Sequence, residues 1–266
     1  MKYFVYLSFI FLLSCSSNKY SSTNKIYKRQ AKAFARAMKQ APLVDSFATA
    51  PQWVGTTNFG MRKPNFVVIH HTAQDSCEQT LRTFTLKRTQ VSAHYVICKD
   101  GTIHHMLNDY LRAWHAGVAR WGNITDVNST SIGIELDNNG FQIFPDAQIN
   151  SLLNLLFYLK KAYNIPQANF IGHSDIAPGR KVDPSTFFPW RELSLKGFGL
   201  WYDDTTQITV PEGFNAMQAL RIIGYDIKDS AAAVRVFKRH FEQQDSSSAI
   251  FETDRKIIYS LYKKYL

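Results

Sequence analysis

The chain has 266 residues, of which 45% are hydrophobic and 14% aromatic, enough for a full-sized globular core and a smaller second unit. Its formal net charge of +10 favours an anionic partner such as a membrane surface or an acidic cell-wall polymer. The lysines and arginines are scattered, and we find no nucleic-acid-binding motif or basic arm, which argues against nucleic acid as the partner.

Residues 1–15 are typical of an export signal. Lys2 precedes the apolar run 3–13, which is too short to cross a bilayer but long enough for the core of a signal peptide. The run ends in Leu-Leu-Ser-Cys, which resembles the lipobox of bacterial lipoproteins and would place a lipid on Cys15. An ordinary cleaved signal with an incidental cysteine is the alternative. We expect residues 16–55 to form a Ser-rich tether followed by a basic helix at about 27–41.

Apolar β-branched runs alternate with helical spacings along residues 56–201. We expect strands at 65–71, 94–98, 102–106, 131–136 and 168–171, and helices at 77–88, 146–163 and 189–201. This order predicts an α/β catalytic domain with a mixed central β-sheet flanked by helices. A polar linker follows at 202–212, and residues 213–266 predict a small three-helix domain with helices at 215–223, 230–242 and 254–265.

A turn-rich loop at 170–184 carries side chains suited to metal binding. His173 follows a short strand, and the Pro178-Gly179 turn can fold Asp183 back toward it. Because neighbouring residues of a strand point to opposite faces, either His70 or His71 can join them, and we expect His70. Two imidazoles, one carboxylate and a water would form an open zinc site.

The same region holds candidates for proton transfer and charge stabilisation. Glu135, near the end of its predicted strand, could accept a proton from water, and Lys181 could stabilise a tetrahedral oxyanion. Zinc lowers the pKa of bound water to about 7 and polarises a carbonyl, which suits amide hydrolysis. His94 is the alternative to His70 as a ligand, and spacing alone leaves structural roles open for all of these residues.

Five separated motifs occur in the order in which they are found in zinc-dependent N-acetylmuramoyl-L-alanine amidases. They are VVIHHTA at 67–73, SAHYV at 92–96, AWHAG at 113–117, SIGIE at 131–135 and GHSDIAPGRKVDP at 172–184. Residues 60–195 therefore resemble this family, which is related to phage amidases and peptidoglycan recognition proteins.

The resemblance implies one Zn²⁺ per chain on His70, His173 and Asp183, with Glu135 and Lys181 as catalytic partners. It implies cleavage of the amide between the lactyl group of N-acetylmuramic acid and L-alanine in peptidoglycan or (anhydro)muropeptides. With the lipobox, the sequence looks most like a lipoprotein branch that is anchored in the cell envelope. We expect the outer membrane, with the enzyme facing the periplasm.

Substrate contacts and the role of the tail follow from the same resemblance. Trp114 and His115 are expected to line the cleft, with core packing as the alternative for Trp114. Asn138, which departs from the family pattern, is expected to affect substrate selectivity. Residues 216–241 resemble a three-helix peptidoglycan-binding module, and a cap that serves only packing is the alternative. Cys77 and Cys98 either pair as a disulfide or stay as two buried thiols.

Two other functions compete with the amidase. Recognition relatives keep this fold after losing catalysis, but a pure binder has no chemical need for Asp183, Glu135 and Lys181 together. A zinc peptidase that cuts within the stem peptide would use the same metal chemistry, and only its products would distinguish it.

Overall fold

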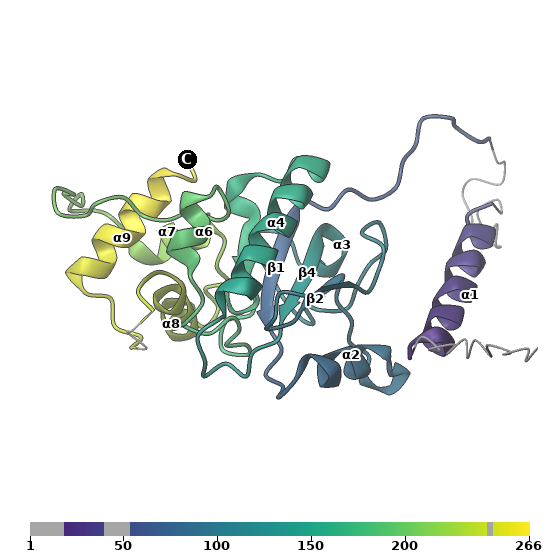
Figure 1. The fold of residues 1–266 in the computed structure, drawn as a ribbon. Coiled ribbons are helices and arrows are strands. Elements are labelled where there is room, and N and C mark those ends of the chain that lie inside the picture. Colours follow the sequence, from purple (N-terminus) through teal and green to yellow (C-terminus); the bar gives the residue numbers. More distant parts are fainter. Residues whose placement is uncertain (1–18, 40–53, 244–246) are drawn as a thin grey trace, which may run out of the picture. The chain divides into compact units, whose positions relative to one another are not determined.

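The computed structural model describes residues 19–39, 54–243 and 247–266 (Figure 1). It has two compact units, one ending at Phe59 and the other spanning Gly60–Leu266. Helix α1 (Ser21–Ala37) lies in the first unit and confirms a basic helix that begins earlier than predicted. The predicted signal peptide and Cys15 lie outside the described residues. Among the helices of the described part, none is long and apolar enough to cross a membrane.

The second unit is built on a five-stranded mixed sheet (Figure 1). Its strands are β1 (Phe66–His71), β2 (Tyr95–Ile97), β3 (Ile103–His105), β4 (Ser131–Leu136) and β5 (Phe170–Gly172), in the order β3-β2-β4-β1-β5. The strands β2, β4, β1 and β5 are parallel, and β3 pairs antiparallel with β2. The predicted mixed sheet is confirmed.

The helices of this unit differ from the prediction mainly where they are short. They are α2 (Cys77–Thr85), α3 (Val127–Thr130), α4 (Asp146–Tyr163), α5 (His173–Ile176), α6 (Trp190–Leu195), α7 (Ala216–Ile223), α8 (Ser230–Phe241) and α9 (Glu252–Lys263), with 3₁₀ turns η1 (Lys87–Thr89) and η2 (Gln167–Asn169). Helix α4 has the predicted bounds, and Asn164 ends it in the left-handed conformation. Helices α2 and α6 are shorter than predicted, and α3 and α5 are too short for periodicity to reveal.

Alternate residues of the strands face two different cores. One face of the sheet packs against α4 and α6, and buries Val67, Ile69, Ile132, Ile134, Leu152, Leu156 and Leu193. Figure 1 shows α4 alongside β1. On the opposite face, Phe66 and Val68 of β1 lie in a core shared with α7, α8 and α9. His70, Ser131, Gly133 and Glu135 have the parity of this second face.

The three C-terminal helices are packed onto the sheet and share its core. Leu220, Phe237 and Ile258 are buried in the same core as Val68 and Ile171. The backbone N–H of Gly122 donates to the oxygen of Gly224 at 2.7 Å, and a Cβ on Gly224 would collide with the Trp121 ring.

A buried polar network at Asp175 joins these helices to the end of β5. One carboxylate oxygen of Asp175 accepts hydrogen bonds from the Gly172 N–H at 2.7 Å and from His240 Nδ1 at 2.8 Å. The other oxygen accepts from the Tyr225 hydroxyl at 3.0 Å. The turn that carries His173 is therefore held from both sides.

Cys77 and Cys98 form a disulfide, with their Cα atoms 5.3 Å apart. Of the two states that the sequence left open, the structure therefore has the paired one. The bond connects the start of α2 to the end of β2.

Because the cores are shared, Phe237→Ala should destabilise the sheet and the C-terminal helices together. Removing a buried phenylalanine side chain costs about 3–5 kcal/mol. Urea unfolding, followed by tryptophan fluorescence and by far-ultraviolet circular dichroism, should show one transition that moves to lower urea with both probes.

The matched control is Leu195→Ala, because Leu195 is 79% exposed and its truncation should change stability by less than about 0.5 kcal/mol. Two separate transitions, with only one of them moved by Phe237→Ala, would contradict a shared core.

Candidate functional site

The candidate site begins at the carboxyl ends of two neighbouring parallel strands. His70 of β1 and Glu135 of β4 are register partners, so their side chains leave the sheet side by side on the same face. His70 Nδ1 lies 4.0 Å from Glu135 Oε1. Both residues are buried. Pairing of the parallel strands alone thus places one imidazole next to one carboxylate.

The loop after β5 supplies the other two charged or ligating groups. His173 is the first residue of α5, directly after Gly172. The chain then turns at Gly179, whose φ of +76° favours glycine, and returns so that Ser174 N–H donates to Asp183 O at 2.7 Å. This loop closure places the Asp183 carboxylate beside the His173 ring.

Three side-chain atoms converge at the centre of the site. His70 Nδ1 lies 2.9 Å from His173 Nδ1 and 3.1 Å from Asp183 Oδ2, and His173 Nδ1 lies 2.9 Å from the same oxygen. All three residues are buried. These separations are close to those of three ligand atoms that each lie about 2 Å from a tetrahedral zinc ion.

The hydrogen-bond partners of the Nε2 atoms of His70 and His173 indicate whether their Nδ1 atoms can bind a cation. His173 Nε2 lies 3.0 Å from the carbonyl oxygen of Ala116, to which it can only donate, so His173 Nδ1 carries a lone pair when the ring is neutral. His70 Nε2 likewise contacts His115 Nδ1, at 3.0 Å. Burial lowers the pKa of His70 to about 4, so its ring is neutral near pH 7. Two ring nitrogens and a carboxylate oxygen therefore face one another, a donor set that suits a divalent cation.

Glu135 is poised to hold a proton close to this centre. The pKa of Glu135 is raised to about 8, mainly by burial and also by the charge of Asp183, while the charge of Lys181 opposes both effects. Its Oε2 atom is buried and has no hydrogen-bond partner among the described residues. Lys181 is half-buried on the same loop as Asp183, with its positive charge acting on this carboxyl group.

The structure separates the three residues that were predicted to touch substrate. Trp114 is 53% exposed, as a contact with a sugar ring requires. His115 does not line an open surface, because it is buried behind His70 and bonded to it. Asn138 is fully buried, with its side chain accepting from Gly140 N–H at 2.8 Å and donating to Gln142 O at 3.1 Å. This geometry favours a structural role for Asn138 over a substrate contact.

The remaining histidines of this region lie outside the converging group. His71 points to the other face of the sheet and its Nδ1 accepts from Ser185 N–H at 3.0 Å. His94 Nδ1 accepts from Gly133 N–H at 3.0 Å, and its Nε2 lies 3.0 Å from Leu111 O. Both ring nitrogens of His94 are thus occupied by backbone, which leaves His70 as the ligand candidate.

Sequence reasoning missed Ser131 and Gly133. Ser131 Oγ lies 3.1 Å from His115 Nε2, and the ring of His115 packs directly on Gly133. The period of two in Ser131, Gly133 and Glu135 was the available signal, because it places all three on one face of β4.

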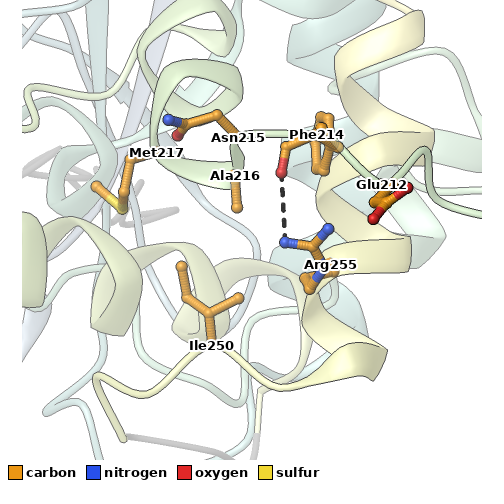
Figure 2. Close-up of a pocket in the computed structure, with 8 residues that line it drawn as sticks. Glu212, Phe214, Asn215, Ala216, Met217, Ile250 and Arg255 are labelled. Carbon is orange, nitrogen blue, oxygen red and sulfur yellow. Dashed lines mark hydrogen bonds between the residues drawn. The ribbon is translucent and has the colours of Figure 1, made fainter.

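A second concave region lies among the C-terminal helices, apart from the histidines (Figure 2). It encloses about 400 Å³ and is lined by Glu212, Gly213, Phe214, Asn215, Ala216, Met217, Ile250 and Arg255. Figure 2 shows Arg255 reaching toward the backbone of Phe214, where its Nη1 donates to the carbonyl oxygen at 3.3 Å. We call this region the C-terminal hollow.

Comparison with known proteins agrees with the motifs and the geometry. Residues 60–186 match the family described as N-acetylmuramoyl-L-alanine amidase. The N-acetylmuramoyl-L-alanine amidase AmiD of Escherichia coli is 32% identical over 230 residues, which covers 75% of this chain and 82% of AmiD.

Two solved structures extend this similarity to most of the chain. AMPDH3 from Pseudomonas aeruginosa superposes with a TM-score of 0.71 at 31% identity, covering 84% of this chain and 99% of that one. E. coli AmiD in complex with anhydro-N-acetylmuramic acid-L-Ala-D-gamma-Glu-L-Lys superposes with a TM-score of 0.69 at 29% identity. The superposition covers 84% of this chain and 97% of the AmiD chain. The motifs, the fold and these relatives together show that the chain belongs to the N-acetylmuramoyl-L-alanine amidase family and is an enzyme.

Proposed function

We propose that the chain is a zinc-dependent amidase that separates the lactyl group of N-acetylmuramic acid from L-alanine. The observation that carries the proposal is the convergence of His70 Nδ1, His173 Nδ1 and Asp183 Oδ2 within 3.1 Å of one another. These three residues would hold one Zn²⁺ per chain. Bound zinc would act as a Lewis acid that lowers the pKa of water and polarises the amide carbonyl.

Glu135 is the proposed general base and acid. Its raised pKa, about 8, and its unpaired buried Oε2 allow it to take a proton from the attacking water and hand it to the departing amine. Transfer to the amine is needed because an amide nitrogen leaves as a neutral amine. The 4.0 Å separation from His70 Nδ1 keeps this carboxylate beside the reacting centre.

Lys181 is the proposed electrostatic partner of the transition state. Its charge already acts on Glu135 across the site, so it would also stabilise negative charge that develops on the carbonyl oxygen. Arg180, its neighbour, donates to Ala116 O at 2.6 Å and to Val118 O at 2.7 Å, which fixes the loop beneath it.

Relatives support a peptidoglycan fragment as the substrate. E. coli AmiD was solved with anhydro-N-acetylmuramic acid-L-Ala-D-gamma-Glu-L-Lys as substrate, and AMPDH3 with anhydromuramic pentapeptide. We propose that this chain likewise acts on peptidoglycan or (anhydro)muropeptides during cell-wall turnover or recycling. Exposed Trp114 offers a flat apolar surface for a sugar ring.

We also propose that the enzyme is exported and held in the envelope by a lipid on Cys15, in the outer membrane and facing the periplasm. The apolar run 3–13 and the lipobox-like residues 12–15 support this proposal. The disulfide between Cys77 and Cys98 supports an oxidising compartment.

The products of digestion test the reaction. Full-length protein, purified in detergent, should release stem peptides with a free L-alanine amine from sacculi and from soluble muropeptides, leaving sugars with a free lactyl carboxylate.

Asp183→Ala should lose both zinc and activity. Glu135→Gln should keep zinc but slow turnover by roughly 10²- to 10⁴-fold, because it removes only the proton acceptor. Mass spectrometry of the products and metal analysis of each protein give these readouts.

Each competing function has its own outcome in this experiment. Cuts inside the stem peptide would make the enzyme a peptidase, and sacculus binding without cleavage would make it a recognition protein. A normal rate for Glu135→Gln would remove Glu135 from the mechanism.

The C-terminal hollow is our proposed binding site for polymeric peptidoglycan. Apolar Met217 and Ile250 lie on its lining beside the guanidinium of Arg255, a combination that suits a stem peptide with a free carboxylate. Arg255 also stacks near the Phe214 ring, with its guanidinium carbon 5.7 Å from the ring centroid, which would orient its remaining donors.

Arg255→Ala should therefore weaken retention on insoluble sacculi by roughly tenfold, the effect of losing one charged hydrogen bond. Cleavage of soluble muropeptides should be unchanged. A sedimentation assay with sacculi measures the retention, and Arg221→Ala is the matched control because Arg221 is an exposed arginine of α7 that does not line the hollow. Equal losses for the two variants would indicate general charge attraction, and no loss for Arg255→Ala would exclude the hollow.

A further inference from the structure

We propose that His115 is a positioning residue, held by Ser131 and Gly133, that sets the tautomer of His70 so that its Nδ1 lone pair faces the metal. This inference rests on the zinc site of the proposed function and extends it to residues outside the ligand set. It assigns each proton along a buried chain of hydrogen bonds from Val127 to His70.

The chain starts at the carbonyl oxygen of Val127, in α3. Ser131 Oγ lies 2.6 Å from this oxygen. A carbonyl oxygen can only accept, so the single hydroxyl proton of Ser131 must lie between these two atoms. The hydroxyl has no second proton to donate, and toward His115 it can only accept.

The position of the Ser131 hydroxyl proton determines the tautomers of His115 and His70. His115 Nε2 lies 3.1 Å from Ser131 Oγ and must donate to it, so in the neutral form of this buried ring Nε2 carries the only N–H. His115 Nδ1 is then an acceptor, and it lies 3.0 Å from His70 Nε2. His70 must therefore carry its proton on Nε2, which leaves the lone pair of Nδ1 directed at His173 and Asp183.

Two further contacts hold the His115 ring at the required distance. The backbone N–H groups of His115 and Ala116 both donate to Asn128 Oδ1, at 3.1 and 2.9 Å. The ring lies flush on Gly133, where an added Cβ would collide with Cγ and Nδ1 of the imidazole. Any side chain larger than hydrogen at Gly133 would push the ring away from His70.

One face of β4 therefore carries the whole arrangement. Ser131 orients the proton of His115, Gly133 makes room for its ring, and Glu135 lies beside His70 at the end of the strand. The motif Ser-x-Gly-x-Glu has a period of two because all three positions act on the same side of the sheet. Donation of the second ring N–H of a metal-binding histidine to an acceptor fixes its tautomer and raises its basicity.

Zinc affinity tests this role separately from activity. His115→Phe keeps a ring but removes the acceptor, and should weaken zinc binding by roughly 10- to 100-fold in competition with a chromophoric chelator. His115→Asn places an amide oxygen near the former Nδ1 and should recover most of that affinity. Ser131→Ala removes only the restraint on the His115 proton, so it should weaken binding less than His115→Phe does.

Two further measurements on the full-length protein complete the experiment. Thermal unfolding shows whether each variant folds, and cobalt spectra report the ligands around the metal. Substitution of Co²⁺ should give the wild type and His115→Asn similar visible absorption, and His115→Phe a changed one. If His115→Phe does not fold, Gly133→Ala serves as the second variant, because it displaces the ring and leaves the imidazole in place.

The outcomes separate this inference from the proposed function. A wild-type protein that binds no zinc would contradict the zinc site itself. A wild type that binds zinc, with His115→Phe or Gly133→Ala of equal affinity and unchanged cobalt spectrum, would overturn the positioning role alone. Equal losses of zinc affinity in His115→Phe and His115→Asn would also overturn it, because a hydrogen-bond acceptor for His70 Nε2 would then make no difference.

Discussion

The structure depends on one electrostatic constraint, the convergence of two imidazole nitrogens and a carboxylate oxygen within 3.1 Å in a buried setting. His173 Nε2 can only donate to Ala116 O, and in the tautomer that we propose His70 Nε2 donates to His115 Nδ1, so that both Nδ1 lone pairs would face Asp183. Such an arrangement is costly without a cation and favourable with one. The elements around it can be understood by how they hold these three atoms in place.

The two faces of the sheet have different roles in holding these atoms. One face packs on α4 and α6 and is mostly apolar, with His71 at its end. The other carries His70 and Glu135 at its carboxyl end and continues into a core shared with the C-terminal helices. Tyr225, just after α7, and His240 of α8 also hold Asp175, two residues from His173. A segment whose sequence suggests a separate binding module thus also supports the turn that carries a metal ligand.

Sequence patterns correctly predicted the features that depend on neighbouring residues, such as strand parity and turns. Strand parity selected His70 over His71, and the Pro178-Gly179 turn brought Asp183 toward His173 as expected. Long-range contacts were not readable from one sequence. The His115 ring was expected at the substrate but lies behind His70, and the pairing of Cys77 with Cys98 depends on a distance set by the sheet. Helices α3 and α5 span only four residues, too few to show a helical period.

Anomalous diffraction at the zinc absorption edge, from crystals of the full-length protein, tests the central claim most directly. The account predicts one strong peak per chain, about 2 Å from Nδ1 of both His70 and His173 and from Oδ2 of Asp183. It also predicts that neither ring binds the ion through Nε2. The absence of a peak among these atoms in a zinc-loaded crystal, or coordination through Nε2 of either histidine, would contradict the account.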